Sequence, residues 1–431
     1  MTKPSPALAG RATLLPVGRA LPPAGLYLGT ALINGLMFTL ALTTYGLYVV
    51  DEAQLTPLQL VLAGTGLEAA AFVAEVPTGV VADVYSRRLS IVIGLVVTAV
   101  GFALMGAVPS FAFVLLGQVV WGVGFTFGSG AREAWLADEI GERPAAAVYV
   151  RAAQLARVGR LAGIPLGAAL GAWSLQAPFV VAGALFLVYA LGLSLTMGER
   201  GYTPPGRRPG EGQWRALAST VRITVTSVRG RPVLVTILVI AVLGGMSSEA
   251  LDRLWPLHLV GRFSFPPFFG LGPVGWFGVI QAGSLIGGIA AVWIAGRLTA
   301  LDDPRSLARS LFVLATLLVA AALGFALAGG FGLALATLWL TGWVRAAQEP
   351  LFLAWVNRGL DSRSRATVLS VFSQADALGQ VAGGPALGVL ATVRSVRAAL
   401  VAVGLVLVPS LPLYGWASRR EPRTDDGKRP E

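Results

Sequence analysis

Residues 79–108 read GVVADVYSRR followed by LSIVIGLVVTAVGFALMGAV: a short polar segment with two adjacent arginines, then 20 residues without a charge. An α-helix needs about 20 consecutive apolar residues to cross a bilayer. Similar apolar runs recur along all 431 residues, of which 55% are hydrophobic and 13% charged. A soluble domain carries about 25% charged residues. The composition therefore predicts an integral membrane protein. It excludes a soluble enzyme, a disordered chain and a nucleic-acid-binding domain, despite a net charge of +11.

The chain has few side chains suited to covalent or metal chemistry. It contains no cysteine, which excludes disulfides, thiol nucleophiles and thiolate metal sites. Its single histidine, His258, cannot form a histidine metal cluster or, by itself, a Ser-His relay. No G-x-x-x-x-G-K-[ST] phosphate-binding loop occurs, so ATP is not a direct energy source. We therefore expect no enzyme activity, no cofactor and no metal site.

Apolar segments joined by short connections predict an all-α fold of twelve transmembrane helices. The fifth span is interrupted by Arg151, Arg157 and Arg160, so hydropathy alone does not identify it. We retain it because an even number of spans and an internal repeat require it. The predicted spans are residues 25–50, 57–82, 89–108, 110–136, 146–170, 176–197, 232–257, 270–295, 310–328, 330–356, 366–391 and 398–416.

Basic residues are distributed unevenly between the two sides of these spans. With the N-terminus inside, the tails, the central polar stretch and the inner loops hold nearly all Lys and Arg outside the spans. The outer loops hold only Arg262, Arg394 and Arg397. Cytoplasmic loops are enriched in Lys and Arg, so we expect a multi-pass protein of the cell (inner) membrane with both termini in the cytoplasm. This asymmetry accounts for the positive charge without a nucleic-acid partner.

The two halves of the chain resemble each other. A single offset of 220 residues aligns Trp135 with Trp355 and Pro165 with Pro385, without a gap between them. The repeat predicts two pseudo-symmetric six-helix halves related by an axis along the membrane normal. The expected domains are an N-terminal half at 1–197, a cytoplasmic central loop at 198–231 and a C-terminal half with its tail at 232–431.

The loop between the second and third spans has a distinctive spacing. Gly79, Asp83, Arg87 and Arg88 match G-x-x-x-D-R-x-G-R-R, although two positions between them differ. This is similar to the signature of the major facilitator superfamily, at its usual place. Together with twelve spans in two halves, the resemblance covers nearly the whole chain. It implies the major facilitator fold and secondary transport by alternating access. We call residues 79–88 the signature segment.

The resemblance also implies roles for individual residues. Asp83 would lie near the start of span 11 and latch the halves on the inside, because a helix N-terminus favours a carboxylate. Gly79 would let two helices approach closely. Arg87 and Arg88 would hold the loop against acids or lipid headgroups; alternatively, they only set the topology. Pro and small residues favour kinked, closely packed helices, and the candidate hinge residues are Gly163, Pro165, Gly384 and Pro385.

Two further stretches bear on the direction of transport. Gln118 stands where efflux relatives carry an arginine in span 4, which weakens the case for a drug/proton antiporter. Residues 129–139 resemble a stretch found in uncharacterised members and in members assigned to efflux, which supports export over uptake.

Charges inside the spans need a partner, water or a function, because a charge at the bilayer centre costs at least about 2.5–3.5 kcal/mol. Glu68 and Asp376 lie near the middle of their helices, without an arginine three or four residues away. We expect one of them to couple transport to protons. The alternative is an ion pair across helices with Arg157 or Arg345.

The resemblance places the substrate cavity mainly on spans 1, 4, 7 and 10. Aromatic walls with few polar groups suit amphipathic or apolar molecules. Glu249 with Arg253, and Arg345 with Glu349, are spaced i,i+4 and are also candidates for structural ion pairs. The cavity candidates are Asn34, Tyr45, Trp121, Arg157, Glu249, Arg345, Gln348 and Glu349.

The sequence thus predicts a monomeric secondary active transporter that exports amphipathic small molecules by alternating access, through proton antiport. Its partners are the substrate, protons and the lipid bilayer. Two alternatives stay open. One is uptake or exchange of a metabolite, an anion or a lipid-like molecule. The other is a membrane sensor that binds a ligand without transporting it.

Overall fold

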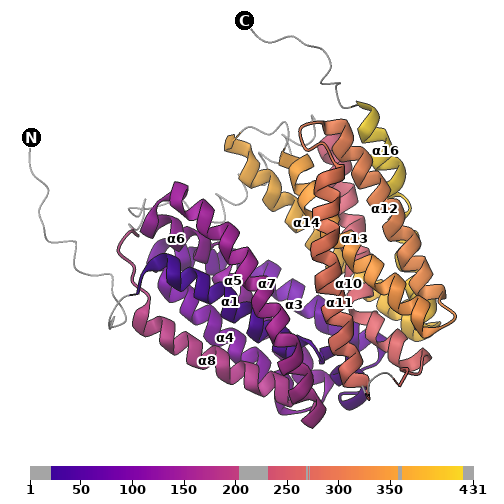
Figure 1. Ribbon diagram of the computed structural model, residues 1–431, viewed down its shortest axis with the longest axis horizontal. Helices are drawn as coiled ribbons and strands as arrows, with labels where there is room; N and C mark the ends of the chain where they lie inside the picture. Colours follow the sequence, from indigo (N-terminus) through magenta and orange to yellow (C-terminus); the bar gives the residue numbers. More distant parts are fainter. Residues whose placement is uncertain (1–20, 203–231, 268–269, 271, 358–361, 421–431) are drawn as a thin grey trace, which may run out of the picture. The chain divides into compact units, whose positions relative to one another are not determined.

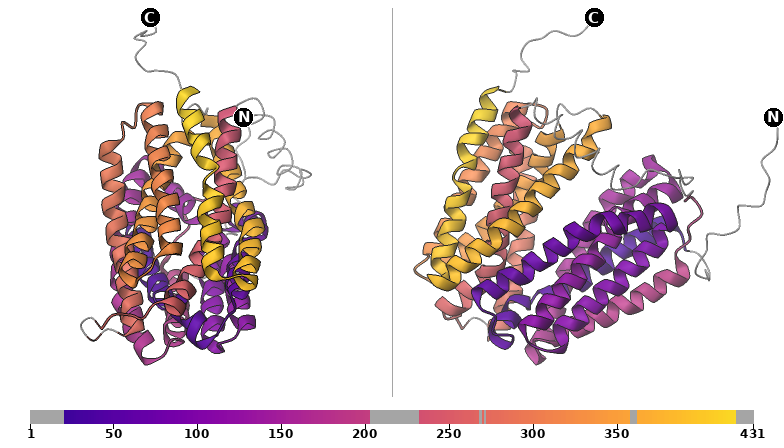
Figure 2. Two further views of the ribbon diagram at one scale, coloured as in Figure 1. Left: turned by 90° about the vertical axis from the view of Figure 1, so that its right-hand side faces the viewer. Right: turned by 180° about the vertical axis from the view of Figure 1, so that it is seen from behind.

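The computed structural model describes residues 21–202, 232–267, 270, 272–357 and 362–420. These residues are almost entirely helical, with no strand among them (Figures 1 and 2). The chain divides into two compact units. Unit 1 contains Met1–Gln54 and Gly66–Arg207, and unit 2 contains Leu55–Thr65 and Arg208–Glu431. Most of the expected central loop at 198–231 lies outside the described residues, which stop at 202.

Unit 1 is built from the first part of the chain. Its third helix, α3, starts in the short stretch assigned to unit 2 and continues in unit 1. Two π-helical turns, η2 and η3, continue α2 and α3. The elements are α1 (Pro23–Leu42), α2 (Tyr45–Leu47), η2 (Tyr48–Glu52), α3 (Pro57–Val80), η3 (Val81–Tyr85), α4 (Arg87–Ala107), α5 (Phe111–Gly128), α6 (Ala131–Ile140), α7 (Glu142–Trp173) and α8 (Ala177–Thr196).

Unit 2 contains the remaining helices. Several begin at proline, which suits the first turn because its amide hydrogen has no partner there. The elements are α10 (Pro232–Arg262), α11 (Pro273–Leu298), α12 (Pro304–Leu327), α13 (Phe331–Asn357), α14 (Ser362–Val393), α15 (Val396–Leu407) and α16 (Ser410–Arg420).

Every predicted span lies on one helix or on consecutive helical segments, which confirms the twelve-span, all-α membrane fold. Within the described ranges, nine helical stretches are long and apolar enough to cross a membrane. Three long helices fall short of that composition: α7, α13 and α14 carry many of the charges placed inside the spans. The doubtful fifth span is nevertheless one continuous helix, α7.

The fourth predicted span is two helices rather than one. The backbone of Gly130 has φ +70°, a conformation that glycine adopts without steric cost. The chain therefore turns after α5, and α6 begins at Ala131. This break places the acidic end of α6 beside the signature segment, as described below.

The same close helix pair occurs in both units. In unit 1, α7 packs on α1, and a Cβ built on Gly159 would meet the backbone of Leu32. In unit 2, α14 packs on α10, and a Cβ built on Gly379 would meet the backbone of Val242. Gly159 and Gly379 are related by the 220-residue offset. Because small residues let helix backbones approach closely, the sequence repeat is also a repeat of packing.

Candidate functional site

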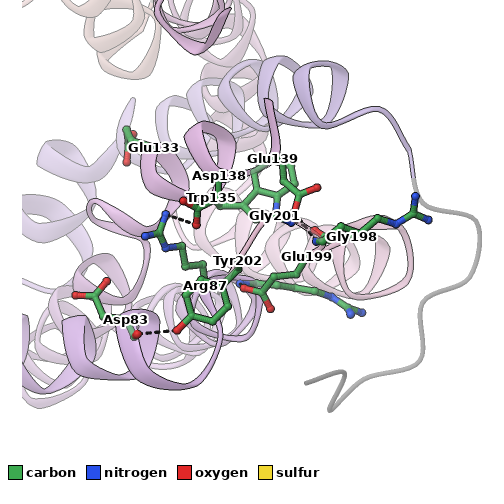
Figure 3. Close-up of polar contacts among 12 residues, drawn as sticks. Asp83, Arg87, Glu133, Trp135, Asp138, Glu139, Gly198, Glu199, Gly201 and Tyr202 are labelled. Atoms are coloured by element: carbon green, nitrogen blue, oxygen red, sulfur yellow. Dashed lines mark hydrogen bonds and ion pairs between the residues drawn. The ribbon is translucent and has the colours of Figure 1, made fainter. Parts of the chain in front are cut away.

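The signature segment is anchored at the start of α4. Ser86 is the N-cap residue, and its hydroxyl accepts a hydrogen bond from the Leu89 amide. Arg87 Nη1 lies 2.6 Å from Oδ2 of Asp138 on α6, and both side chains are partly buried. Asp83 is exposed on η3. The arginine predicted to meet acids or lipid headgroups thus meets an acid within its own unit (Figure 3).

Glu199, just after α8, accepts hydrogen bonds from two donors at the start of α4. Its Oε2 accepts the Ser86 hydroxyl at 2.5 Å, and its Oε1 accepts the Arg88 amide at 3.1 Å. Arg88 itself is 3% exposed, and its guanidinium donates to the backbone oxygen of Ser194. An arginine held in this way contributes structure, in addition to any effect on topology.

The segment 198–202 also contacts α6 and η3 (Figure 3). Oε1 of Glu139 accepts the amides of Arg200 and Gly201 at 2.5 and 2.7 Å. The indole of Trp135 donates to Gly198 O at 2.8 Å. These bonds fasten the chain that follows α8 against the acidic end of α6.

Tyr202 closes the cluster. Its hydroxyl donates to the backbone oxygen of Asp83 at 2.6 Å, and the Arg87 guanidinium lies 5.6 Å from its ring centroid (Figure 3). Burial, and then the charge of Glu199, raise the pKa of Tyr202 above its ordinary value of 10.0. The hydroxyl therefore stays protonated at neutral pH and remains a donor. We call Arg87, Asp138, Glu139, Glu199 and Tyr202 the loop cluster.

We predicted a latch between Asp83 and the start of span 11, and the span 11 side of this contact lies outside the described residues. Residues 358–361 are not described, nor are the side chains of residues 362–370. This contact stays a prediction. The loop cluster was missed from sequence because Asp138, Glu199 and Tyr202 lie far from the signature segment in the chain. The available signal was weak: short acidic and aromatic stretches directly after spans 4 and 6.

A neighbouring contact joins three helices of unit 1. The Tyr27 hydroxyl of α1 donates to Glu133 Oε1 of α6 at 3.2 Å. The Tyr149 hydroxyl of α7 donates to the backbone oxygen of the same Glu133 at 2.7 Å. The two tyrosine rings meet edge to face at 5.6 Å.

A second group of charged side chains lies in unit 2. Arg345 of α13 donates two hydrogen bonds to Asp252 of α10, at 2.5 and 2.9 Å. The spacing predicted that Arg345 could pair with Glu349 on the same helix. Its guanidinium instead forms its ion pair with Asp252 on α10. Glu349 is exposed on α13, and Gln348 beside it is partly exposed.

The other predicted pair of unit 2 is present. Nε of Arg253 lies 3.1 Å from Oε1 of Glu249, which is 3% exposed. A Cβ built on Gly64, near the start of α3, would collide with this pair, and one on Gly384 would lie 2.8 Å from Glu249 Cγ. Glycine at both positions leaves room for the ion pair between α3, α10 and α14.

Asp376 has a neutral partner: Gln380 Nε2 donates to its Oδ2 at 2.8 Å.

The candidates of unit 1 are more dispersed. Asn34 is buried on α1. Trp121 packs at 5.7 Å from Phe38 and 5.3 Å from Phe102, in an aromatic core. Tyr45 packs on the Phe179 ring. Two predicted charged residues also lie in unit 1. Glu68 is partly exposed on α3, and Arg157 is exposed on α7.

The predicted hinge residues lie in uninterrupted helices. Gly163 on α7 faces the backbone of α1, where a Cβ would lie 2.9 Å from Leu40 N. Pro165 and Pro385 lie inside α7 and α14, which continue through them. Among the described residues, no group of three or more His, Asp or Glu could hold a metal ion.

With this geometry in place, the sequence comparison is decisive. Residues 27–339, from α1 into α13, match the Major Facilitator Superfamily. The chain belongs to that superfamily. It is therefore a multi-pass membrane transporter and not an enzyme.

The most informative relatives of this transporter are distant. It is 26% identical over 138 residues to the uncharacterized MFS-type transporter YxaM of Bacillus subtilis (strain 168), across 32% of this chain. That alignment spans about a third of YxaM, 35% of its length.

Solved structures share the fold of this superfamily member. The nucleoside transporter NupG is 13% identical, with a TM-score of 0.71 over 93% of this chain and 99% of its own. A POT family transporter in complex with a thioalcohol-conjugated peptide is 12% identical (TM-score 0.73, 92% and 96% covered). An inward-facing, unoccupied bacterial homolog of the human lysosomal transporter Spinster is 16% identical (TM-score 0.68, 92% and 96% covered).

Proposed function

We propose that this transporter exports amphipathic small molecules in exchange for protons, by alternating access of its two halves around a cavity. The observation that carries the proposal is the environment of Asp376. Its hydrogen-bond partner Gln380 is neutral. Arg345, one of the two arginines considered as alternative partners, donates two hydrogen bonds to Asp252. A carboxyl with a neutral partner gains and loses a proton without breaking an ion pair.

The position of Asp376 suits a coupling role. A Cβ built on Gly245 of α10 would meet the backbone oxygen of Asp376, so the residue lies where α10 and α14 approach closely. A change of charge there acts directly on the packing of this helix pair. Charged groups within membrane helices mark proton and substrate pathways in transporters. Glu68 is the second coupling candidate.

The remaining parts of the proposal follow from the sequence. The Lys and Arg asymmetry supports a protein of the cell (inner) membrane with both termini in the cytoplasm, and we propose that it acts as a monomer. Residues 129–139 support export. The latch role of Asp83 rests on the signature segment, which the loop cluster holds in place.

The test uses full-length protein in liposomes that enclose a pH-sensitive dye. A proton gradient is imposed, and lipophilic cations, neutral drugs and anions are added in turn. The parent protein is expected to show proton movement that depends on one substrate class. Asp376→Asn should abolish this movement while retaining substrate exchange across the membrane without a gradient. Glu142→Gln, on an exposed residue at the start of α7, is the matched control and should behave as the parent.

Other results would replace the proposal. Substrate flux without proton movement in the parent would indicate uptake or exchange, with Arg157 and Arg160 as the next residues to test for an anion. Ligand binding without any flux would indicate a sensor. Proton movement that survives in Asp376→Asn and is lost in Glu68→Gln would assign coupling to Glu68.

A further inference from the structure

A small cavity lies inside unit 1, among α1, α4, α5 and α8. Its volume is about 60 Å³ and it is partly open. The lining is mainly apolar and includes the rings of Phe38, Phe125 and Phe186; Phe125 is 52% exposed. The space admits a few waters or one small end group of a larger molecule.

One polar atom in this cavity lacks a partner. Asn34 of α1 is 7% exposed, and its Oδ1 is buried without a hydrogen bond. Two neighbouring polar groups of the lining have partners elsewhere. Thr30 shares a hydrogen bond of 2.7 Å with Tyr189, and Arg132 Nε donates to Gly128 O at 3.3 Å. Buried polar atoms nearly always have a partner, so Asn34 Oδ1 indicates a missing donor.

The chemistry of the lining restricts that donor. An amide oxygen only accepts hydrogen bonds, so the group must carry an O–H or N–H. Arg132 lines the same cavity and disfavours a second positive charge. A hydroxyl or a neutral amide N–H therefore fits better than an ammonium. The cavity is far smaller than the roughly 300–1,000 Å³ of a whole ligand pocket, so the rest of the ligand must lie outside it.

We propose that this cavity is a subsite for a neutral, hydrogen-bond-donating end group of the transported amphipathic molecule. The end group donates to Asn34 Oδ1, and the adjoining apolar part packs on Phe38 and Phe125. This inference rests on the proposed transport of amphipathic molecules. It specifies that unit 1 recognises substrates with a neutral, hydrogen-bond-donating end group.

The test compares 2-phenylethanol, which carries one hydroxyl donor, with its methyl ether, in which a methyl group replaces the donated hydrogen. Binding is measured by isothermal titration to full-length protein in nanodiscs, and empty nanodiscs give the lipid background. The parent is expected to bind the alcohol about tenfold more tightly, the effect of one hydrogen bond to a buried acceptor. Asn34→Leu should remove the preference. Asn357→Leu is the matched control, because Asn357 has a partnerless buried oxygen in unit 2, and it should keep the preference.

Equal affinity of the parent for the two probes would overturn the proposal and leave the cavity as a water site. A preference that persists in Asn34→Leu would also overturn it. If Asn34→Leu does not fold, Asn34→Ala removes the same acceptor without adding volume. The experiment involves no proton gradient, so its outcome is separate from that of the antiport test. A protein that discriminates the probes but moves no protons keeps the subsite and loses antiport.

Discussion

Arg345 of α13 and Asp252 of α10 are joined by two parallel hydrogen bonds, Nη1 to Oδ1 at 2.5 Å and Nη2 to Oδ2 at 2.9 Å. Their side chains are 36% and 48% exposed. The bridge joins two residues that lie 93 positions apart in the sequence. Because it engages Arg345, it leaves Asp376 to its neutral partner Gln380.

The geometry of this bridge predicts that lysine cannot replace Arg345. A lysine ammonium is a point charge and cannot form the two parallel bonds that a guanidinium donates. We expect Arg345→Lys and Asp252→Asn each to lower the initial transport rate about tenfold, the effect of losing roughly 1.4 kcal/mol of interaction. Transport into inverted vesicles measures the rate. Arg309→Lys, on an exposed position of α12, is the control. Unchanged rates in both bridge variants would show that the bridge has no functional role.

The repeated helix contact predicts matched losses of stability in the two units. A methyl group on Gly159 would meet the backbone of Leu32, and one on Gly379 the backbone of Val242. Backbone atoms cannot move aside cheaply, so each glycine-to-alanine substitution should lower the free energy of unfolding by about 1–3 kcal/mol. Thermal unfolding in detergent measures the loss. Gly192→Ala, with no heavy atom within 4 Å of the added carbon, should leave the midpoint unchanged. A midpoint unchanged in Gly159→Ala would refute the close contact.

Glu199 is predicted to hold the signature segment. Its carboxylate accepts from the Ser86 hydroxyl and the Arg88 amide. Glu199→Ala leaves these donors at the start of α4 without their acceptor, so the first turn should open more often. Hydrogen exchange followed by mass spectrometry should show faster exchange over residues 86–89. Glu75→Ala, on an exposed residue of α3, is the control. Equal exchange rates in the parent and Glu199→Ala would contradict this role.

Tyr202 predicts a pH dependence at alkaline pH. Its pKa is raised above 10.0, by burial first and by the charge of Glu199 second; Asp83 and Asp138 act in the same direction and Arg87 opposes them. A raised folded-state pKa gives stability that is complete below the unfolded value of 10.0 and is lost as pH rises through the folded value. The melting-point difference between the parent and Tyr202→Phe should therefore stay constant up to about pH 10 and shrink above it. A difference that shrinks between pH 6 and 9 would assign the effect to another group.

The sequence predicted the helices well because each span is a long apolar run or a repeat of one. Span 5 shows the limit of composition. Arg151, Arg157 and Arg160 interrupt its hydropathy, and it was identified by the even number of spans and by the repeat with span 11. The break at Gly130 was missed because the predicted span was extended beyond the apolar run of α5 into the charged first turn of α6. Periodicity reports burial along one helix and does not report where a helix changes direction.

The candidate site was predictable only where partners share a helix. Glu249 and Arg253 lie one turn apart, so their ion pair follows from spacing. Arg345 has an equally spaced acid in Glu349, yet it binds Asp252 on another helix. Spacing lists the possible partners of a side chain and cannot rank them against partners from other helices.

By itself, the sequence determined that this protein crosses the membrane many times, that its halves repeat and that it carries the signature segment of its superfamily. These properties depend on local hydrophobicity and on residue types at fixed spacings. Only the tertiary structure decided that Arg87 meets Asp138, that Glu199 accepts the Arg88 amide at the start of α4 and that Asn34 Oδ1 is buried without a partner. Such contacts join residues far apart in the chain. They are set by how closely helices pack and by the geometry of each hydrogen bond, which no linear pattern encodes.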